Sequence, residues 1–231
     1  GKPWYDLNIL REKGNADMTA ERHLDNTPQT PGTPDTVEQY FALAAQRPDL
    51  FTPDDGLVMD PEEMRAFSRA TGKPMGLVYD NRPYYMVLAD LYRGGAGRLA
   101  SYARVVYPQP GTNGAVAVPR RGERYGLLRS FRHAPRAECL EFPRGFAEEG
   151  LTPEENIRKE LDEEMGAEVR QLRYLGDIRA DTGLSSGCVQ VFLAEVDGGE
   201  ARVGHEGIRE LIWMTEEELR AKIAAGEITD G

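Results

Sequence analysis

Residues 141–167 form an acid-rich segment, EFPRGFAEEGLTPEENIRKELDEEMGA, in which carboxylates, glycines and apolar residues are concentrated. Its second half carries a full set of helix signals. Thr152 is a favourable N-cap, Pro153 suits the first helical position, and Glu155 completes a capping box. Gly166 supplies a left-handed stop. The segment is therefore predicted to fold as a short apolar run, a Pro-Arg-Gly turn, an acidic loop and one short helix.

This predicted helix has one buried side with a line of carboxylates beside it. Its apolar residues recur every four positions: Ile157, Leu161 and Met165. Glu160 and Glu164 have the same spacing, so they lie one above the other at the border of the apolar stripe, with Glu163 nearby. Like charges at this spacing repel one another, and a hard cation such as Mg²⁺ would remove the repulsion. A solvated acidic face is the alternative to a metal site, and the helix alone does not distinguish the two, so the flanking residues are needed as well.

The chain totals bound the function classes. The 231 residues suffice for one large domain, or for one domain and an appendage. A net charge of −11 argues against non-specific binding to nucleic acid or to an anionic membrane. No apolar run is long enough to span a membrane, and the N-terminus carries no signal segment, so a cytoplasmic protein is expected. Cys139 and Cys188 are predicted to be free thiols.

The pattern divides the chain into three parts. Residues 1–36 are polar and proline-rich, which predicts an extended arm. Residues 37–74 predict a small helical appendage, in which Asp60 caps the second helix and Gly72 follows its end. Residues 75–231 contain apolar runs joined by hairpin-like turns, and two helices late in the chain. The predicted class is α+β, with a mixed sheet between helical layers.

The acid-rich segment resembles the Nudix box, whose pattern is G-x5-E-x7-R-E-U-x-E-E-x-G-U, with U a bulky aliphatic residue. The positions that match in register are Gly145, Glu160, Leu161, Glu163, Glu164 and Gly166. Three positions depart from the pattern. Leu151 stands where the family has its first Glu, Lys159 where it has Arg, and Ala167 where it has an aliphatic residue. In the family that Glu and Arg help to brace the loop against the helix, so their replacement bears on the loop geometry.

The flanks of the box are similar to the ADP-ribose pyrophosphatase branch of the Nudix hydrolases. The lead-in YGLLRSFRHAPRAECLEFPRG resembles that branch's arginine-bearing strand and its E-[LF]-P-x-G motif, although Ser130 replaces a Gln. The later segments GLSSGCVQVFLAEV and EGIRELIWMTEEEL resemble its last strands and final helix. The resemblance covers about residues 75–231, and implies a Nudix-type α/β/α sandwich preceded by an N-terminal appendage.

The resemblance also implies a metal site. Glu160 and Glu164 would ligate Mg²⁺, with Mn²⁺ as an alternative ion, and the backbone carbonyl of Arg144 would lie nearby. Glu141 is a further candidate ligand. Glu163 is a candidate catalytic residue that would act through metal or water. Metal ions on a diphosphate offset its charge and activate a water molecule for in-line attack.

The general base in this branch often comes from a glutamate in a later loop. Glu206, in the segment HEGIRE, fits this position best, and Glu200 is the runner-up. A solvated loop position is the alternative for both.

Substrate contacts are expected from Arg129, Arg132 and Gly145. An arginine guanidinium suits a diphosphate or a terminal ribose. The alternative for either arginine is an ion pair with Glu138 or Glu141.

Together these features predict Mg²⁺-dependent hydrolysis of the pyrophosphate bond of ADP-ribose or a related nucleoside-diphosphate sugar. The resemblance implies a homodimer that acts on a small molecule. Leu151 and Lys159 motivate an alternative, a catalytically weak or inactive Nudix-fold module that binds a nucleotide. Two further alternatives remain. One is a different substrate, such as a nucleoside triphosphate, a dinucleoside polyphosphate or a prenyl diphosphate. The other is a structural partner protein that uses the helical appendage.

Overall fold

The computed structural model describes residues 35–53, 56–111, 113–200, 204 and 207–229. The arm predicted for residues 1–36 therefore lies outside the described residues, apart from its last two positions. Among the helices of the described part, none is both long enough and apolar enough to cross a membrane.

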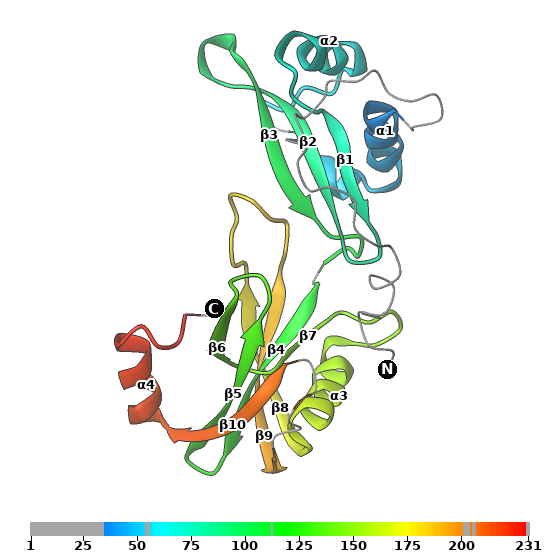
Figure 1. Cartoon of the computed structure of the whole chain (residues 1–231). Coiled ribbons are helices and arrows are strands. Elements are labelled where there is room, and N and C mark those ends of the chain that lie inside the picture. The colour runs from blue at the N-terminus through cyan, green and yellow to red at the C-terminus, as the bar shows by residue number, and fades with distance from the viewer. Residues whose placement is uncertain (1–34, 54–55, 112, 201–203, 205–206, 230–231) are drawn as a thin grey trace, which may run out of the picture. The chain divides into compact units, whose positions relative to one another are not determined.

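The first described elements form a small helix-and-sheet unit (Figure 1). Its elements are α1 (Thr36–Gln46), the 3₁₀ helix η2 (Pro48–Phe51), α2 (Pro61–Thr71), β1 (Gly76–Asn81), β2 (Tyr85–Arg93), the 3₁₀ helix η3 (Gly95–Gly97) and β3 (Leu99–Val106). The sheet order is β1-β2-β3, and both pairings are antiparallel. Asp60 accepts hydrogen bonds from the first turn of α2, and Gly72 ends that helix at a φ of 70°. Both predicted signals are confirmed.

One hydrophobic core joins these helices to these strands. It contains Tyr40 of α1, Met64 of α2, and Leu88 of β2. The prediction grouped the two helices as an appendage and assigned every strand from residue 75 onward to the later domain. In the structure β1–β3 form a sheet of their own that shares its core with α1 and α2. A sheet of three short strands needs a helical layer to bury its apolar face, which α1 and α2 supply.

The remaining strands form the larger sheet. They are β4 (Gly114–Arg121), β5 (Arg124–Arg132), β6 (Ala137–Glu141), β7 (Arg144–Phe146), β8 (Ala167–Ile178), β9 (Val189–Gly198) and β10 (Ile208–Thr215). The main order is β10-β5-β4-β9-β8, while β6 pairs with β5 and β7 pairs with β4. The β4–β9 pairing is parallel, and the other pairings are antiparallel. The predicted mixed sheet is confirmed.

Helices cover both faces of this sheet: α3 (Pro153–Met165) on one and α4 (Glu216–Ala224) on the other. Successive strand residues point to opposite faces. Leu128 accordingly packs with Ile157, Leu161 and Met165 of α3. Its neighbour Leu127 belongs to a separate core that includes Leu219 of α4. The α+β sandwich expected from the sequence is confirmed.

Candidate active site

The register of α3 is fixed at both ends by local chemistry. The Thr152 hydroxyl accepts the Glu155 amide at 3.2 Å, and the Glu155 carboxylate accepts the Thr152 amide at 2.8 Å. The backbone hydrogen bond from Thr152 lowers the pKa of Glu155 below its ordinary value, and the Thr152 hydroxyl adds to the effect. At the other end Gly166 adopts a left-handed φ of 57°. These two caps set which helix positions face the sheet, as the sequence predicted.

The three carboxylates expected to carry the chemistry differ in burial. Glu164 is only 3% exposed and lies among the buried residues of α3. Glu160 and Glu163 are partly buried. An ionised carboxylate is costly to bury unless positive charge or hydrogen bonds compensate it. The three carboxylates are therefore partly or fully buried, which distinguishes them from a fully solvated acidic face.

Gly145 gives Glu160 its place. A Cβ built on Gly145 would lie 1.9 Å from Oε1 of Glu160 and 2.3 Å from its Cδ, so the carboxylate fills the space that a side chain would take. β7 holds Gly145 in the sheet opposite Ala115 of β4. On β4 itself, a Cβ on Gly114 would lie 2.5 Å from the Gly145 carbonyl oxygen. Two glycines thus let the turn, the sheet edge and the helix approach one another.

Glu141 is held by arginine. It is 1% exposed, and the Arg132 Nε lies 2.7 Å from Oε1 and 2.8 Å from Oε2. The Arg144 Nη2 lies 3.6 Å from Oε2. The β5–β6 pairing, which places Glu141 opposite Leu128, brings this carboxylate to the strand that carries Arg132. The ion pair foreseen as the alternative for Arg132 is therefore present.

The structure does not bring the other predicted site residues into contact with these carboxylates, as far as the described residues show. Arg129 forms an exposed ion pair with Glu210, with Nε 3.1 Å from Oε2. Glu206 lies outside the described residues. Glu200, the runner-up base, is exposed, and its backbone amide donates to the Met165 carbonyl at 2.7 Å, at the end of α3.

Sequence reasoning missed two residues that tie the acidic loop to α3. Asn156, which is 2% exposed, donates from Nδ2 to the Phe146 carbonyl at 2.9 Å. Glu148 accepts a hydrogen bond from Lys159. The signal for Asn156 was present, because it stands four residues before Glu160 and so continues the line of acids. Glu148 carried no such periodic signal, because it lies in an irregular loop.

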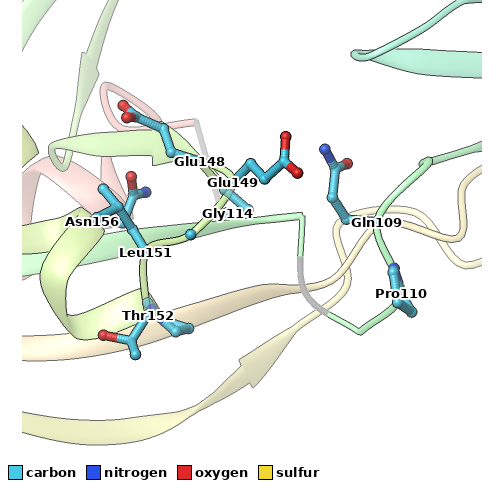
Figure 2. A pocket seen from close by; sticks show the side chains of 11 residues that line it. Gln109, Pro110, Gly114, Glu148, Glu149, Leu151, Thr152 and Asn156 are labelled. Carbon is cyan, nitrogen blue, oxygen red and sulfur yellow. The ribbon is translucent and has the colours of Figure 1, made fainter.

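A pocket of about 290 Å³ opens beside this loop and the start of α3. Figure 2 shows side chains that line it, among them Glu149, Leu151, Thr152 and Asn156. The described residues of its lining do not include the three candidate carboxylates of α3. The pocket therefore lies beside the acidic loop and apart from these carboxylates.

The donor set suits a hard divalent cation. No three His, Cys, Asp or Glu side chains in the described ranges are grouped closely enough to make a ready-formed metal site. Mg²⁺, however, typically takes one or two carboxylates together with waters and substrate phosphates. Glu160, cradled on Gly145, and the buried Glu164 one helical turn later match that requirement.

The later part of the chain is similar to proteins of a known family. The model of the NUDIX domain matches residues 111–230. A NAD-capped RNA hydrolase NudC of Photobacterium profundum is 32% identical over 84 residues, which cover 36% of this chain and 31% of the relative. An ADP-sugar pyrophosphatase of Mus musculus is 35% identical over 75 residues, 32% of this chain and 34% of the relative. The match thus spans about a third of each relative's length.

A solved structure described as an ADP compounds hydrolase shares the fold. It aligns with a TM-score of 0.55 at 17% sequence identity, and the alignment covers 67% of this chain and 82% of that structure. At this identity the likeness speaks to the fold alone.

Proposed function

Because this chain belongs to the Nudix family, we propose that it hydrolyses the pyrophosphate bond of ADP-ribose or of a related nucleoside-diphosphate sugar with Mg²⁺. The mouse relative named ADP-sugar pyrophosphatase supports this substrate class. The observation that carries the proposal is the contact of Glu160 with Gly145, one helical turn from the buried Glu164. A solvated acidic face would need neither the glycine nor the burial.

The proposed roles follow from these positions. Glu160 and Glu164 would hold the ion, with Glu141 and the carbonyl of Arg144 as further candidates. Bound Mg²⁺ supplies charge neutralisation on the diphosphate and a more acidic water. Glu163, partly exposed beside that pair, would act through the metal or through a water molecule.

The arginines and the later loop would complete the site. Arg132 would bind the diphosphate at the edge of its pair with Glu141, since its side chain keeps 29% exposure. Arg129, whose side chain is 38% exposed, is the second candidate for this contact. Glu206 is the proposed general base.

A diphosphate panel tests the proposal. Purified protein is incubated with Mg²⁺ and ADP-ribose, other nucleoside-diphosphate sugars, NAD⁺ and NAD-capped RNA, and the products are separated by chromatography. We expect ADP-ribose to give AMP and ribose 5-phosphate. Glu164→Gln should lower kcat at least about 100-fold, since a catalytic metal supplies several kcal/mol and each 1.36 kcal/mol is a factor of ten. Glu154→Gln, which neutralises an exposed acid of the same helix, is the matched control.

Two outcomes would point elsewhere. If wild-type protein cleaves none of the panel but binds ADP-ribose in calorimetry, it is the alternative foreseen from the sequence, a nucleotide-binding module on a Nudix fold. If it cleaves NAD-capped RNA fastest, the bacterial relatives named as NAD-capped RNA hydrolases are the better guide. The net charge of −11 on this chain disfavours that second result, because RNA binding draws on positive charge.

The resemblance also supports a homodimeric assembly, which stays a prediction, as does the cytoplasmic location expected from the sequence. Light scattering on the purified chain tests the assembly. A mass of one chain, against 25.7 kDa per protomer, would contradict it.

A further inference from the structure

The two brace positions of the box pattern have changed partners in this chain. Leu151 is apolar and 39% exposed, so it cannot pair with a base. Lys159 instead bonds to Glu148, three residues before Leu151 in the loop, and the two side chains of this pair are 40% and 44% exposed. The Leu151 amide donates to the Glu148 carbonyl at 3.2 Å, which closes a turn between the two positions. The basic residue at position 159 is thus paired with an acid at position 148, and not with one at position 151 as in the family pattern.

The loop that this ion pair holds follows β7, which carries Gly145, and ends at the N-cap of α3. Near its start, Asn156 binds the Phe146 carbonyl. In its middle, Glu148 is bound by Lys159. Lys159 directly precedes Glu160, and its Nζ lies 3.8 Å from the Glu163 carboxylate. The same turn of α3 therefore carries Lys159, which holds the loop, and the acids Glu160 and Glu163, which are proposed to act in catalysis.

We propose that Glu148 and Lys159 form the loop-to-helix brace of this chain and are positioning residues that keep Gly145 against Glu160. The inference rests on the proposed function, because it assigns these two residues a part in placing the metal-binding acid. Neither residue would touch the substrate.

The neighbouring acid on the loop provides a matched control. Figure 2 shows the side chains of Glu148 and Glu149 leaving the loop in different directions, with Glu149 extending toward Gln109. Glu149 is exposed, as is Glu148. Substitution of either acid by glutamine removes the same charge from the same loop, but only Glu148→Gln removes the contact with Lys159.

The first experiment measures metal binding and turnover. Mn²⁺ is titrated into the full chain and followed by electron paramagnetic resonance, and kcat and KM are measured with ADP-ribose. Outer-shell partners of metal ligands typically contribute about 10–100-fold, so we expect Glu148→Gln and Lys159→Met each to weaken Mn²⁺ binding about tenfold. By the same principle kcat should fall similarly, with KM changed less than about twofold. Glu149→Gln should leave all three values unchanged.

The signs of the effects separate a brace from a simple change of electrostatic field. If Lys159 acted only through its charge, Lys159→Met would remove a positive charge beside the acids and tighten Mn²⁺ binding, whereas Glu148→Gln would weaken it. A brace requires both substitutions to weaken binding. Opposite signs would therefore overturn the proposal, and so would equal behaviour of Glu148→Gln and Glu149→Gln.

A rescue makes the assignment specific. In the Glu148→Gln background, Leu151→Glu together with Lys159→Arg restores the pair of the family pattern. We expect this triple variant to recover most of the lost Mn²⁺ affinity. If it recovers none while its Tm equals that of wild type, the brace assignment is wrong.

Hydrogen exchange separates failure of this inference from failure of the proposed function. Glu148→Gln should speed exchange of the amides at residues 147–151, and Glu149→Gln should not. Should wild-type protein cleave no diphosphate or bind no Mn²⁺, the proposed function or its metal site fails, while this exchange comparison still decides whether the brace exists. Equal exchange in both variants would overturn it.

Discussion

Gly145→Ala is the substitution whose effect follows most directly from the structure. The new Cβ would lie 1.9 Å from Oε1, 2.3 Å from Cδ and 2.7 Å from Cγ of Glu160. Contacts this short cannot persist, so one of the two groups must move. Gly145 is fixed by its pairing with Ala115, whereas the end of the Glu160 side chain is flexible. We therefore expect the carboxylate to swing out of its place.

The magnitude has a stability part and an activity part. Overpacking typically costs about 1–3 kcal/mol, and the low end, about 1 kcal/mol, applies here because a flexible side chain can yield. For a chain of this size that corresponds to a fall in Tm of about 2–4 °C. Hydrolysis of ADP-ribose should fall about 100-fold, because a displacement of about 1 Å near the reacting groups can cost that much.

A double-mutant cycle isolates the clash. In the Glu160→Ala background the Cβ introduced by Gly145→Ala would meet no carboxylate. Removing a glycine should then be neutral, or stabilise the fold by up to about 1 kcal/mol through the unfolded state. Gly95→Ala, at a glycine with nothing within 4 Å, controls for that general effect. Calorimetric Tm values for the four proteins of the cycle provide the test. Equal losses of Tm from Gly145→Ala in both backgrounds would refute the reasoning.

Three further predictions concern the supports of the site. Arg132→Leu leaves the carboxylate of Glu141 buried without its main partner. Chemical denaturation should show that the free energy of unfolding falls by about 3 kcal/mol. This is the low end for a broken buried ion pair, because the Arg144 guanidinium still lies 3.6 Å from the Glu141 carboxylate. An unchanged midpoint would contradict this. Thr152→Ala removes the N-cap of α3 and should cost about 1 kcal/mol in the same assay, and Thr152→Ser should restore most of it. Folding lowers the pKa of Glu155 below its ordinary value of 4.5. The ionised carboxylate therefore stabilises the fold above about pH 4.5, and this stabilisation is lost as the pH falls through the pKa of the folded state. The Tm difference between wild type and Glu155→Gln should therefore be larger at about pH 7 than at about pH 3, and an equal difference at both would refute the assignment.

What the sequence could predict was mostly what local chemistry decides. The ends of α3 depend on Thr152, Glu155 and Gly166, which act on their own turn, so the helix and its register followed without knowledge of the fold. The buried stripe of α3 followed from the same register. The alternation within β5, where adjacent leucines face different cores, likewise follows from strand geometry.

What the sequence could not predict depends on which distant segments meet. The apolar runs that form β1–β3 resemble those of the later strands in sequence, but in the structure they form a separate sheet that shares its core with α1 and α2. The choice of Arg132 over other partners for Glu141 depends on the pairing of β5 with β6. The contact of Glu148 with Lys159 depends on a turn in an irregular loop, whose direction no periodicity encodes.

The parallel pairing of β4 with β9 bears on how the protein is made. Asn113, at the entry to β4, and Cys188, at the entry to β9, are joined by a hydrogen bond although they stand 75 residues apart. The acidic loop and α3 lie inside that long connection. While the ribosome is still synthesising residues before β9, the nascent chain holds every proposed metal-binding acid, but lacks the strand that joins β4 to β8 in the sheet on which α3 rests. Because contacts so distant in sequence form late, the site should mature only after β9 has emerged, and residues 141–167 alone should not reproduce it.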